Sequence, residues 1–493
     1  MEKHILSKST FLRGVQCAKS LYLYKNFIQL RDSVSAEQQA IFNRGNKVGL
    51  LAQKLFLGGI DATSTKRSNN IASVEKTKQL IESGAKVIYE AAFQHQHVLA
   101  ILDILVKVDE KWFAYEVKSS TKISATYLLD ASLQYWVITN SGLPLEDISL
   151  ITINNKYLRN GVIDLNQLFS ITSIKEHALK NQDLITEKIN LSKQVVVESR
   201  MPDIEIGEQC FTPYNCDFMG NCWKSVPKNS VFEITGIAKS EQFSLYNQGF
   251  KTIMEIPEIN SLNEGVKTHI KSVKAGNPII DLLAINQFLN KVEYPLFFMD
   301  FETFMPAIPI YDNTRPYQHI PFQYSLHYKK DKCAPIEHFC FLAEQGFDPR
   351  KLFIENLLKH SEGEGTVLVY DALMEKGVLN ALKIEFPQYA LNIDNLLNRI
   401  VDLMQPFQAK SYYHPDMKNS YSIKNLLHAL VPELSYKNLK ISSGSIAMVA
   451  FENMQTETDM FKILEIREQL LAYCELDTLS MVKIFEILEQ QVK

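Results

Sequence analysis

Residues 97–118 read HVLAILDILVKVDEKWFAYEVK, two apolar runs on either side of a short polar segment. This pattern predicts a β-hairpin whose two-residue turn is Asp109-Glu110. Facing residues of such a hairpin have numbers that sum to 219, so Asp103 lies opposite Glu116. The β-carbons of directly opposed residues are about 5 Å apart, and two carboxylates at that spacing suit one hard cation.

The second strand of this hairpin also carries a lysine. Lys118 follows Glu116 by two residues and therefore points to the same face, where an ammonium polarises a phosphate or orients an attacking water. Mg²⁺ prefers oxygen ligands and lowers the pKa of water, so these residues indicate metal-assisted phosphodiester hydrolysis. The alternative is a surface hairpin with a polar face. Strands this apolar are normally buried, however, and a buried Asp–Glu pair needs a partner.

The elements around the hairpin indicate an α/β or α+β unit. Helices are expected over residues 11–30, 36–57 and 124–139, and strands over 86–93, 97–107, 111–118 and 148–154. Further strands are expected over 296–300, 321–328 and 366–370, and a long helix over 461–492. A chain of 493 residues exceeds one ordinary core, and we divide it into residues 1–228, 229–290 and 291–493. The middle part is a small helical connector, either a helix-hairpin-helix that contacts phosphates or a structural spacer.

The composition is that of a soluble globular protein, with 46% hydrophobic and 22% charged residues. No apolar run reaches 18 residues and no basic-then-apolar leader is present, so we expect a cytoplasmic protein without a membrane partner. The net charge of −4 gives no global nucleic-acid signature. A local binding groove stays compatible with that charge.

Four of the seven cysteines are placed as a metal cluster requires. Cys17 lies near the start, and Cys210, Cys216 and Cys222 follow at five-residue spacings in a turn-rich segment. Clustered cysteines in a reducing compartment more often bind metal than form disulfides, and four thiolates suit zinc or an iron–sulfur cluster. The residues alone leave both open, as well as four buried free thiols. The remaining cysteines are interpreted as ordinary residues: Cys333, Cys340 and Cys474.

A second carboxylate set lies in the last part of the chain. Residues 297–303 read FFMDFET, and Asp300 and Glu302 therefore share one strand face. Tyr473 and Asp477 share one helix face at i and i+4. Such a set holds two cations about 4 Å apart in a two-metal nuclease, and the tyrosine hydroxyl would position the attacking water.

The hairpin motif resembles the core of the PD-(D/E)XK nucleases, and in particular the RecB-like exonucleases of the CRISPR-associated and AddB types. The resemblance rests on Asp103…Glu116-x-Lys118, with Glu90 on the preceding strand and Gln134 on the following helix. It implies that Asp103 and Glu116 bind Mg²⁺ or Mn²⁺, that Lys118 is catalytic and that Gln134 supports the site.

Two features depart from that family. The segment 44–49 lacks the metal-binding histidine that often follows the early helix, and Ile138 stands where a tyrosine usually follows the helix glutamine.

With this resemblance, the early cysteine and the late three-cysteine loop are similar to the 4Fe–4S staple of RecB-like nucleases. The five-and-five spacing differs from the commoner pattern of that staple.

The second carboxylate set resembles the DEDD 3′→5′ exonucleases of RNase H-like fold, in their Tyr-x-x-x-Asp subtype. Asp300 and Glu302 match the first motif, and Tyr473 and Asp477 match the third. The second motif is irregular, since VLVYDALME at 367–375 lacks the usual Phe-Asp. We take Glu375 as the first choice for the fourth carboxylate and metal ligand and Asp371 as the second. Asp402 is interpreted as a supporting residue. An active exonuclease, a degenerate nucleic-acid binder and a chance pattern all stay open.

Together, both ends of the chain resemble a bacterial family that fuses an iron–sulfur RecB-like nuclease to a DEDD-type exonuclease. The resemblance implies an α/β protein with a restriction-endonuclease-like domain, a helical connector and an RNase H-like domain. Its expected activity is metal-dependent hydrolysis of DNA at two sites, in DNA processing, repair or defence against foreign DNA. The alternatives are a non-catalytic nucleic-acid-binding protein and an RNA-processing exonuclease that uses only the last domain.

Overall fold

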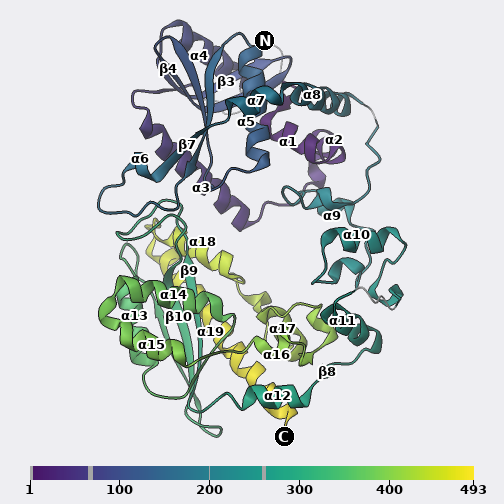
Figure 1. Cartoon of the computed structure of the whole chain (residues 1–493), viewed down its shortest axis with the longest axis vertical. Coiled ribbons are helices and arrows are strands. Elements are labelled where there is room, and N and C mark those ends of the chain that lie inside the picture. Colours follow the sequence, from purple (N-terminus) through teal and green to yellow (C-terminus); the bar gives the residue numbers. More distant parts are fainter. Residues whose placement is uncertain (1–3, 65–69, 199, 258–261) are drawn as a thin grey trace. The chain divides into compact units, whose positions relative to one another are not determined.

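The structure is a computed structural model that describes residues 4–64, 70–198, 200–257 and 262–493, and its fold is α/β (Figure 1). The chain forms two compact units. The first comprises Met1–Ser225 and Pro306–Tyr317, and the second comprises Val226–Met305 and Gln318–Lys493. The short segment 306–317, which the sequence places in the last domain, thus belongs to the first unit.

The sheet of the first unit has the strand order β2-β3-β4-β5-β6-β7, with β1 beside β4. Its strands are β1 (Leu6–Ser7), β2 (Ile60–Asp61), β3 (Val87–His95), β4 (Val98–Val108), β5 (Lys111–Val117), β6 (Leu145–Ile153) and β7 (Phe169–Ser173). The pairs Ile104–Tyr115 and Val108–Lys111 confirm the predicted hairpin register. Asp109 and Glu110 have φ angles of 46° and 63°, as a two-residue hairpin turn requires.

Helix α5 (Ala125–Asn140) connects β5 to β6, which run parallel. Ser124 caps this helix by accepting a hydrogen bond from the Tyr127 N–H. Most of the α5 side chains from residue 130 to residue 138 are buried against the sheet. The crossover therefore brings polar residues of α5 to the end of β5.

The predicted helix over residues 11–30 is wrong in one respect, because the structure divides it at a cysteine. Helix α1 (Lys8–Gln16) and helix α2 (Ala18–Asn26) meet at Cys17, whose backbone is extended at φ −160° and ψ 115°. The sequence also gave no indication of α4 (Asn70–Glu82). The other helices of this unit are α3 (Ala36–Ala52), α6 (Leu165–Leu168), α7 (Lys175–Lys180), α8 (Gln182–Val197) and α9 (Met219–Cys222).

The sheet of the second unit has the strand order β11-β10-β9-β12-β13. Strands β9 (Leu296–Phe304), β10 (Ile320–Lys329) and β11 (Ile336–Leu342) are antiparallel, and β12 (Thr366–Val369) and β13 (Ile400–Asp402) run parallel to β9. The strands predicted at β9, β10 and β12 are confirmed, whereas β11 and β13 were not predicted.

Helices cover both faces of this sheet (Figure 1). One face packs against α13 (Arg350–His360), α14 (Ala372–Glu385) and α15 (Ala390–Asn398). The other packs against α12 (Leu282–Leu289), α17 (Ile423–Leu430) and α19 (Met460–Gln491). The long helix α19 confirms the helix predicted over 461–492. The remaining elements are α10 (Lys239–Asn247), α11 (Glu264–Ala275), β8 (Ile279–Ile280), α16 (Gln405–Gln408), β14 (Tyr412–Tyr413) and α18 (Gly444–Met454).

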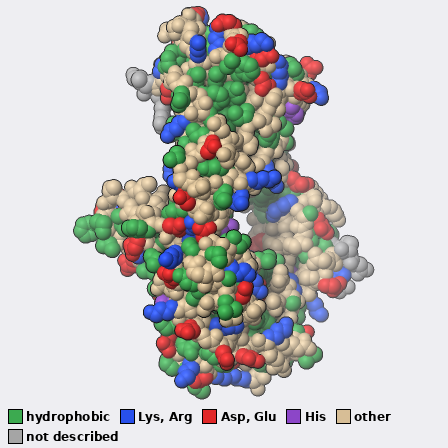
Figure 2. Space-filling view, turned by 60° about the vertical axis from the view of Figure 1, so that its left-hand side comes forward, with side chains coloured by type: hydrophobic (Ala, Val, Ile, Leu, Met, Phe, Trp, Pro, Cys, Tyr) green, Lys and Arg blue, Asp and Glu red, His purple; other side chains and the backbone are tan. Residues whose placement is uncertain are grey.

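The surface mixes charges of both signs. On the face drawn in Figure 2, Lys and Arg side chains are interspersed with Asp and Glu side chains, in keeping with the small net charge of −4. Among the described residues, no helix combines the length and the apolarity that a membrane span needs.

Candidate functional site

Three carboxylates converge on one face of the second sheet. Asp300 and Glu302 alternate along β9 and so point to the same side, and α19 crosses that side with Asp477. One oxygen from each of the three lies within 4.8 Å of the others. The sequence predicted these residues as ligands of a two-metal site, and the structure brings them together from positions almost 180 residues apart in the chain.

Glu375 is a fourth acidic residue whose charge reaches this triad, although none of its oxygens lies within 4.8 Å of all three. It lies in the first turn of α14, its side chain is buried, and its Oε2 has no hydrogen-bond partner among the described residues. The charge of Glu375 helps to raise the pKa of Glu302, and the charge of Asp300 helps to raise the pKa of Glu375. Asp371 is exposed at the cap of α14, where Asp402 accepts hydrogen bonds from the N–H groups of Asp371 and the next residue, each at 3.2 Å. The geometry therefore favours Glu375 over Asp371 as the fourth carboxylate.

Burial and mutual repulsion raise the pKa values of this acidic cluster. The pKa values of Asp300, Glu302 and Glu375 lie well above the usual range, with burial as the largest cause and repulsion among the acids as the next. Burial raises the pKa of Asp477 to about 6, against the opposing effect of a hydrogen bond from Tyr436. A cation among these oxygens would remove the repulsion and favour the ionised forms.

Two tyrosines and a lysine surround Asp477. Tyr436 donates a hydrogen bond to Asp477 Oδ1 at 2.6 Å, and the hydroxyl of Tyr473 also hydrogen-bonds to Asp477. The Nζ of Lys424, on α17, lies 5.2 Å from the ring centroid of Tyr436 and 5.5 Å from that of Tyr473. Sequence reasoning missed Tyr436 and Lys424, because neither stands in a motif with a recognisable spacing.

Cys474, to which the sequence analysis assigned no role, lies within this site. Its Sγ is 3.8 Å from Asp300 Oδ2, and its side chain is completely buried. Gly444, at the start of α18, is also close. A Cβ at that position would lie 3.5 Å from Glu302 Oε2. The only local signal for Cys474 is its place on α19, one residue after Tyr473.

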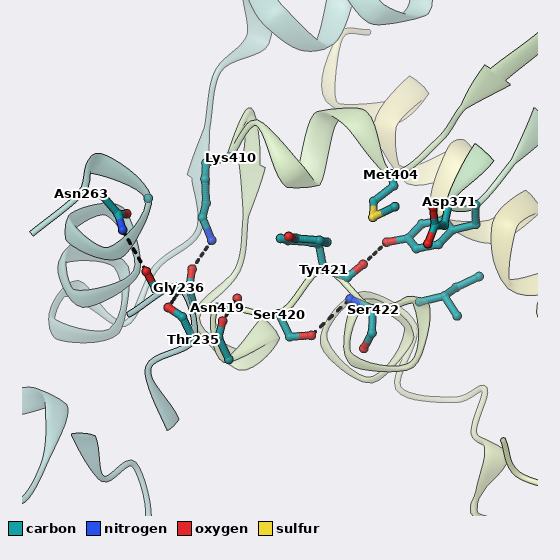
Figure 3. A pocket seen from close by; sticks show the side chains of 13 residues that line it. Thr235, Gly236, Asn263, Asp371, Met404, Lys410, Asn419, Ser420, Tyr421 and Ser422 are labelled. Atoms are coloured by element: carbon teal, nitrogen blue, oxygen red, sulfur yellow. Dashed lines mark hydrogen bonds between the residues drawn. The ribbon is translucent and has the colours of Figure 1, made fainter. Parts of the chain in front are cut away.

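A cavity of about 640 Å³ opens beside the second-motif residues (Figure 3). Asp371 lines one side, and Lys410 and Asn263 line another. Lys410 donates a hydrogen bond to the side chain of Asn419, and burial lowers its pKa to about 8. Tyr421, 38% exposed, adds an aromatic side chain to the wall. Amides, hydroxyls, an aromatic ring and an amine thus line a space that also includes an acid from the second motif.

The predicted first site is organised around two lysines. Lys118 Nζ lies 2.7 Å from Glu116 Oε1 and 2.6 Å from Asp130 Oδ2. Lys8 Nζ, from the first turn of α1, lies 2.5 Å from the same Glu116 oxygen. Asp103 instead accepts a hydrogen bond from the Val117 N–H at 2.6 Å. Sequence reasoning missed Lys8 and Asp130. Asp130 could have been found four residues before Gln134 on the same helix face.

The electrostatics of this site differ from those of the second. Burial alone would raise the pKa of Glu116, but Lys118 and Lys8 lower it to about 2. Burial and repulsion by Glu116 place the pKa of Asp103 well above its usual range. The ammonium groups therefore favour the ionised form of Glu116 and engage its Oε1, while its buried Oε2 has no hydrogen-bond partner among the described residues. Burial and the nearby carboxylate favour the protonated form of Asp103.

Glu90 and Gln134 flank this arrangement. Glu90 interrupts the β3–β4 pairing opposite Asp103 and has a φ of 53°, a strained backbone for a residue with a side chain. Burial, followed by repulsion from Asp61, raises its pKa to about 7. Gln134 is fully buried and donates to Asp130 Oδ1 at 3.2 Å. Glu90, Asp103 and Glu116 do not bring three oxygens within 4.8 Å of one another.

The four predicted cysteines line one small cavity in the first unit. All four are free thiols. Cys222 is close enough to the other three for their charges to contribute to the rise of its pKa. Burial raises the pKa values of both Cys17 and Cys222. No three of the four sulfur atoms lie within 4.8 Å of one another.

Polar contacts fix the cysteine loop to the amino-terminal helices. Arg13 forms a two-pronged ion pair with Asp217, and Arg31 Nε lies 2.5 Å from the same carboxylate. Gln16 donates hydrogen bonds to the carbonyl groups of residues 209 and 214 at 2.8 and 2.7 Å. Two segments almost 200 residues apart in sequence are therefore joined at the cavity that the cysteines line.

Comparison with known proteins gives relatives without an assigned activity. Residues 297–422 match the sequence model of a domain of unknown function, DUF2779. Over 398 residues, the chain is 22% identical to the uncharacterised protein MG366 of Mycoplasma genitalium. The match covers 70% of this chain and 59% of that relative.

Proposed function

We propose that the chain is a metal-dependent nuclease whose principal active site lies in the second unit and acts as a 3′→5′ exonuclease. The observation that carries this proposal is the convergence of Asp300, Glu302 and Asp477 within 4.8 Å, with Glu375 buried beside them. The strand arrangement supports it as well. A sheet with three antiparallel strands followed by two strands parallel to the first is the arrangement of the RNase H-like fold.

The four carboxylates would hold Mg²⁺ or Mn²⁺, and oxygen ligands of this kind are the ones that both ions prefer. The ions would supply Lewis-acid stabilisation of the phosphate charge and would lower the pKa of water. The chain's own groups would orient the reactants. Tyr436 and Tyr473 fix the position of Asp477, and Lys424 adds positive charge beside Glu302 and Asp477.

The polar cavity next to Asp371 would receive the nucleotide adjoining the scissile bond. Its lysine could contact a phosphate, and the ring of Tyr421 could stack on a base. Stacking and backbone contacts of this kind are tolerant of base sequence. We therefore propose a single-stranded end as the substrate, with DNA as the first choice and RNA as the alternative.

The decisive experiment is digestion of 5′-labelled single-stranded DNA and RNA of equal sequence with Mg²⁺ or Mn²⁺. We expect a ladder that shortens from the 3′ end, and we expect Glu302→Gln and Asp477→Asn to reduce the rate at least 100-fold. Glu468→Gln is the matched control, because Glu468 is exposed on α19, the helix that carries Asp477. A wild type that binds nucleic acid without cleaving it would instead identify a non-catalytic binding protein.

We propose the first unit as a second nuclease site of the PD-(D/E)XK type, stapled by a 4Fe–4S cluster. Its support is the order of three strands, helix and strand around Asp103 and Glu116, and the cavity shared by four thiols. Tetrahedral zinc would hold sulfur atoms about 3.8 Å apart, given Zn–S bonds of about 2.3 Å. No three of the four sulfurs lie within 4.8 Å of one another, and the resemblance to the RecB-like nucleases makes a 4Fe–4S cluster the first choice over zinc.

The cluster is tested by the colour of the protein. Anaerobically purified wild type should be brown and contain about four iron and four sulfide per chain, and Cys222→Ser should lose both. Cys333→Ser is the matched control, since Cys333 is exposed and lies in the second unit. Colourless protein with one zinc per chain would replace the cluster by a zinc site.

A further inference from the structure

Two histidines and a glutamate form a separate group in the second unit. His327 on β10 and His338 on β11 are cross-strand neighbours, and their rings stack with centroids 4.6 Å apart. Glu475 of α19 completes the group, and one ligating atom from each of the three lies within 4.8 Å of the others. None of these residues belongs to the carboxylate cluster described above.

Hydroxyl groups fix the orientation of both rings. His327 Nδ1 lies 2.8 Å from Thr478 Oγ1, and His338 Nε2 lies 2.9 Å from Ser325 Oγ. These two hydroxyls are 2.6 Å apart and hydrogen-bonded to each other. Each imidazole therefore uses one ring nitrogen in the protein and keeps the other for a further partner. Orientation of a ring by its second nitrogen is the usual arrangement behind histidine ligands of metals.

Among the residues that the structure describes, neither of the two remaining nitrogens has a partner at hydrogen-bond distance. His338 Nδ1 lies 3.9 Å from Glu475 Oε1, too far for a hydrogen bond. Within the part of the chain that the structure describes, the Thr478 contact is the one hydrogen bond of the His327 side chain. Burial lowers the pKa values of both histidines below the usual range. The neighbouring His338 ring also lowers the pKa of His327, which is about 4. Neutral imidazole is the form that binds metals.

We propose that His327, His338 and Glu475 bind a zinc ion. Two imidazoles and a carboxylate are a ligand set of zinc sites that leave a fourth position to water. Glu475 is 51% exposed and His338 is 26% exposed, so the fourth position faces solvent. Imidazole ligands favour zinc, whereas the carboxylate cluster favours Mg²⁺ or Mn²⁺. The two sites thus differ in the metal that each prefers.

The position of the zinc site gives it a mechanical role. The ion would join β10 and β11 to α19, the helix that carries Tyr473 and Asp477. Ser325, which orients His338, is the cross-strand partner of Asp300. Zinc would therefore fix α19 against the sheet beside the carboxylate cluster. This inference does not depend on nuclease activity.

The test is zinc analysis of the 493-residue chain after dialysis against micromolar Zn²⁺ in millimolar Mg²⁺, which occupies the carboxylate sites. We expect His338→Ala and Glu475→Gln to bind one zinc fewer per chain than wild type. His428→Ala and Glu468→Gln, which replace exposed residues of the same unit, should bind as wild type does. Any zinc held by the four cysteines is common to all five proteins and cancels in the comparison.

Two outcomes would overturn the proposal. One is equal zinc content in wild type, His338→Ala and Glu475→Gln. The other is loss of the same zinc in Asp300→Asn, which would place the ion in the carboxylate cluster. Glu475→Gln guards against misfolding, because its side chain is half exposed and the amide keeps its size. Thermal unfolding with and without Zn²⁺ gives a second readout, and Zn²⁺ should stabilise the proteins with an intact site more than it stabilises His338→Ala and Glu475→Gln.

Discussion

At the scale of single residues, the second site holds more buried negative charge than its surroundings neutralise. The pKa values of Asp300, Glu302 and Glu375 lie well above the usual range, and that of Asp477 is about 6. The unfolded chain ionises these groups near pH 4. Between about pH 4 and pH 6 it therefore binds fewer protons than the folded chain, and the free energy of unfolding falls as pH rises. For Asp477 alone the loss is about 3 kcal/mol.

The metal-free protein should accordingly be less stable at pH 8 than at pH 5. Asp300→Asn removes one repelling charge, so we expect it to raise the melting temperature at pH 8 in EDTA by about 2–8 °C. Mg²⁺ should stabilise wild type more at pH 8 than at pH 5 and should stabilise the variant little. Thermal unfolding followed by circular dichroism measures both effects, with Glu468→Gln as the control. An Asp300→Asn variant that is less stable than wild type in EDTA at pH 8 would contradict this account.

The residues that the sequence could predict at this site are those with a regular spacing. Asp300 and Glu302 alternate on a strand, and Asp477 follows Tyr473 by one helical turn, so their shared faces follow from geometry alone. Tyr436 lies in a short 3-10 turn and Lys424 at the start of α17. Their approach to Asp477 depends on how irregular segments pack, which no local period encodes.

At the scale of elements, the start of α1 decides the charge balance of the first site. Lys8 Nζ and Lys118 Nζ both contact Glu116 Oε1, so two ammonium groups offset the charge that Glu116 would offer to a metal ion. The sequence predicted the hairpin register correctly because the turn and the alternation fix it together. It did not predict Lys8, because the parallel pairing of β1 with β4 joins residues more than 90 positions apart.

Replacement of Lys8 by methionine should therefore strengthen metal binding at the first site. Removal of one competing ammonium leaves Glu116 with a single lysine, and we expect the Mn²⁺ affinity to rise by up to about tenfold, or about 1.4 kcal/mol. The measurement is Mn²⁺ titration by calorimetry in an Asp300→Asn background, which weakens the second site. Lys25→Met, a change at a lysine of the next helix, serves as the control. Unchanged or weaker binding would show that Lys8 supports the site instead of competing with the ion.

At the scale of the whole molecule, the two units have separate hydrophobic cores. The division near residue 225 lies close to the predicted boundary at 228, because a long chain exceeds one core. The sequence could not predict that residues 306–317 pack with the first unit and not with the second. This packing rests on contacts such as the ion pair of Arg159 with Asp312, whose partners are distant in sequence.

Separate cores lead us to expect two thermal transitions, each sensitive to substitutions in its own unit. Asp217→Asn tests this, because burial alone would raise the pKa of Asp217, but Arg13 and Arg31 lower it. Its ion pairs therefore stabilise the first unit above the unfolded pKa near 4, and that stability is lost as pH falls through the folded pKa.

At pH 7 we expect Asp217→Asn to lower only the transition of the first unit, by about 1–2 kcal/mol for these partly exposed ion pairs. The exposed Asp203, replaced by asparagine, provides the matched control. Differential scanning calorimetry separates the two transitions, and Asp300→Asn should shift the other one. If a single transition responds equally to both substitutions, the two units unfold as one cooperative structure, and the independence assumed for their metal sites fails with it.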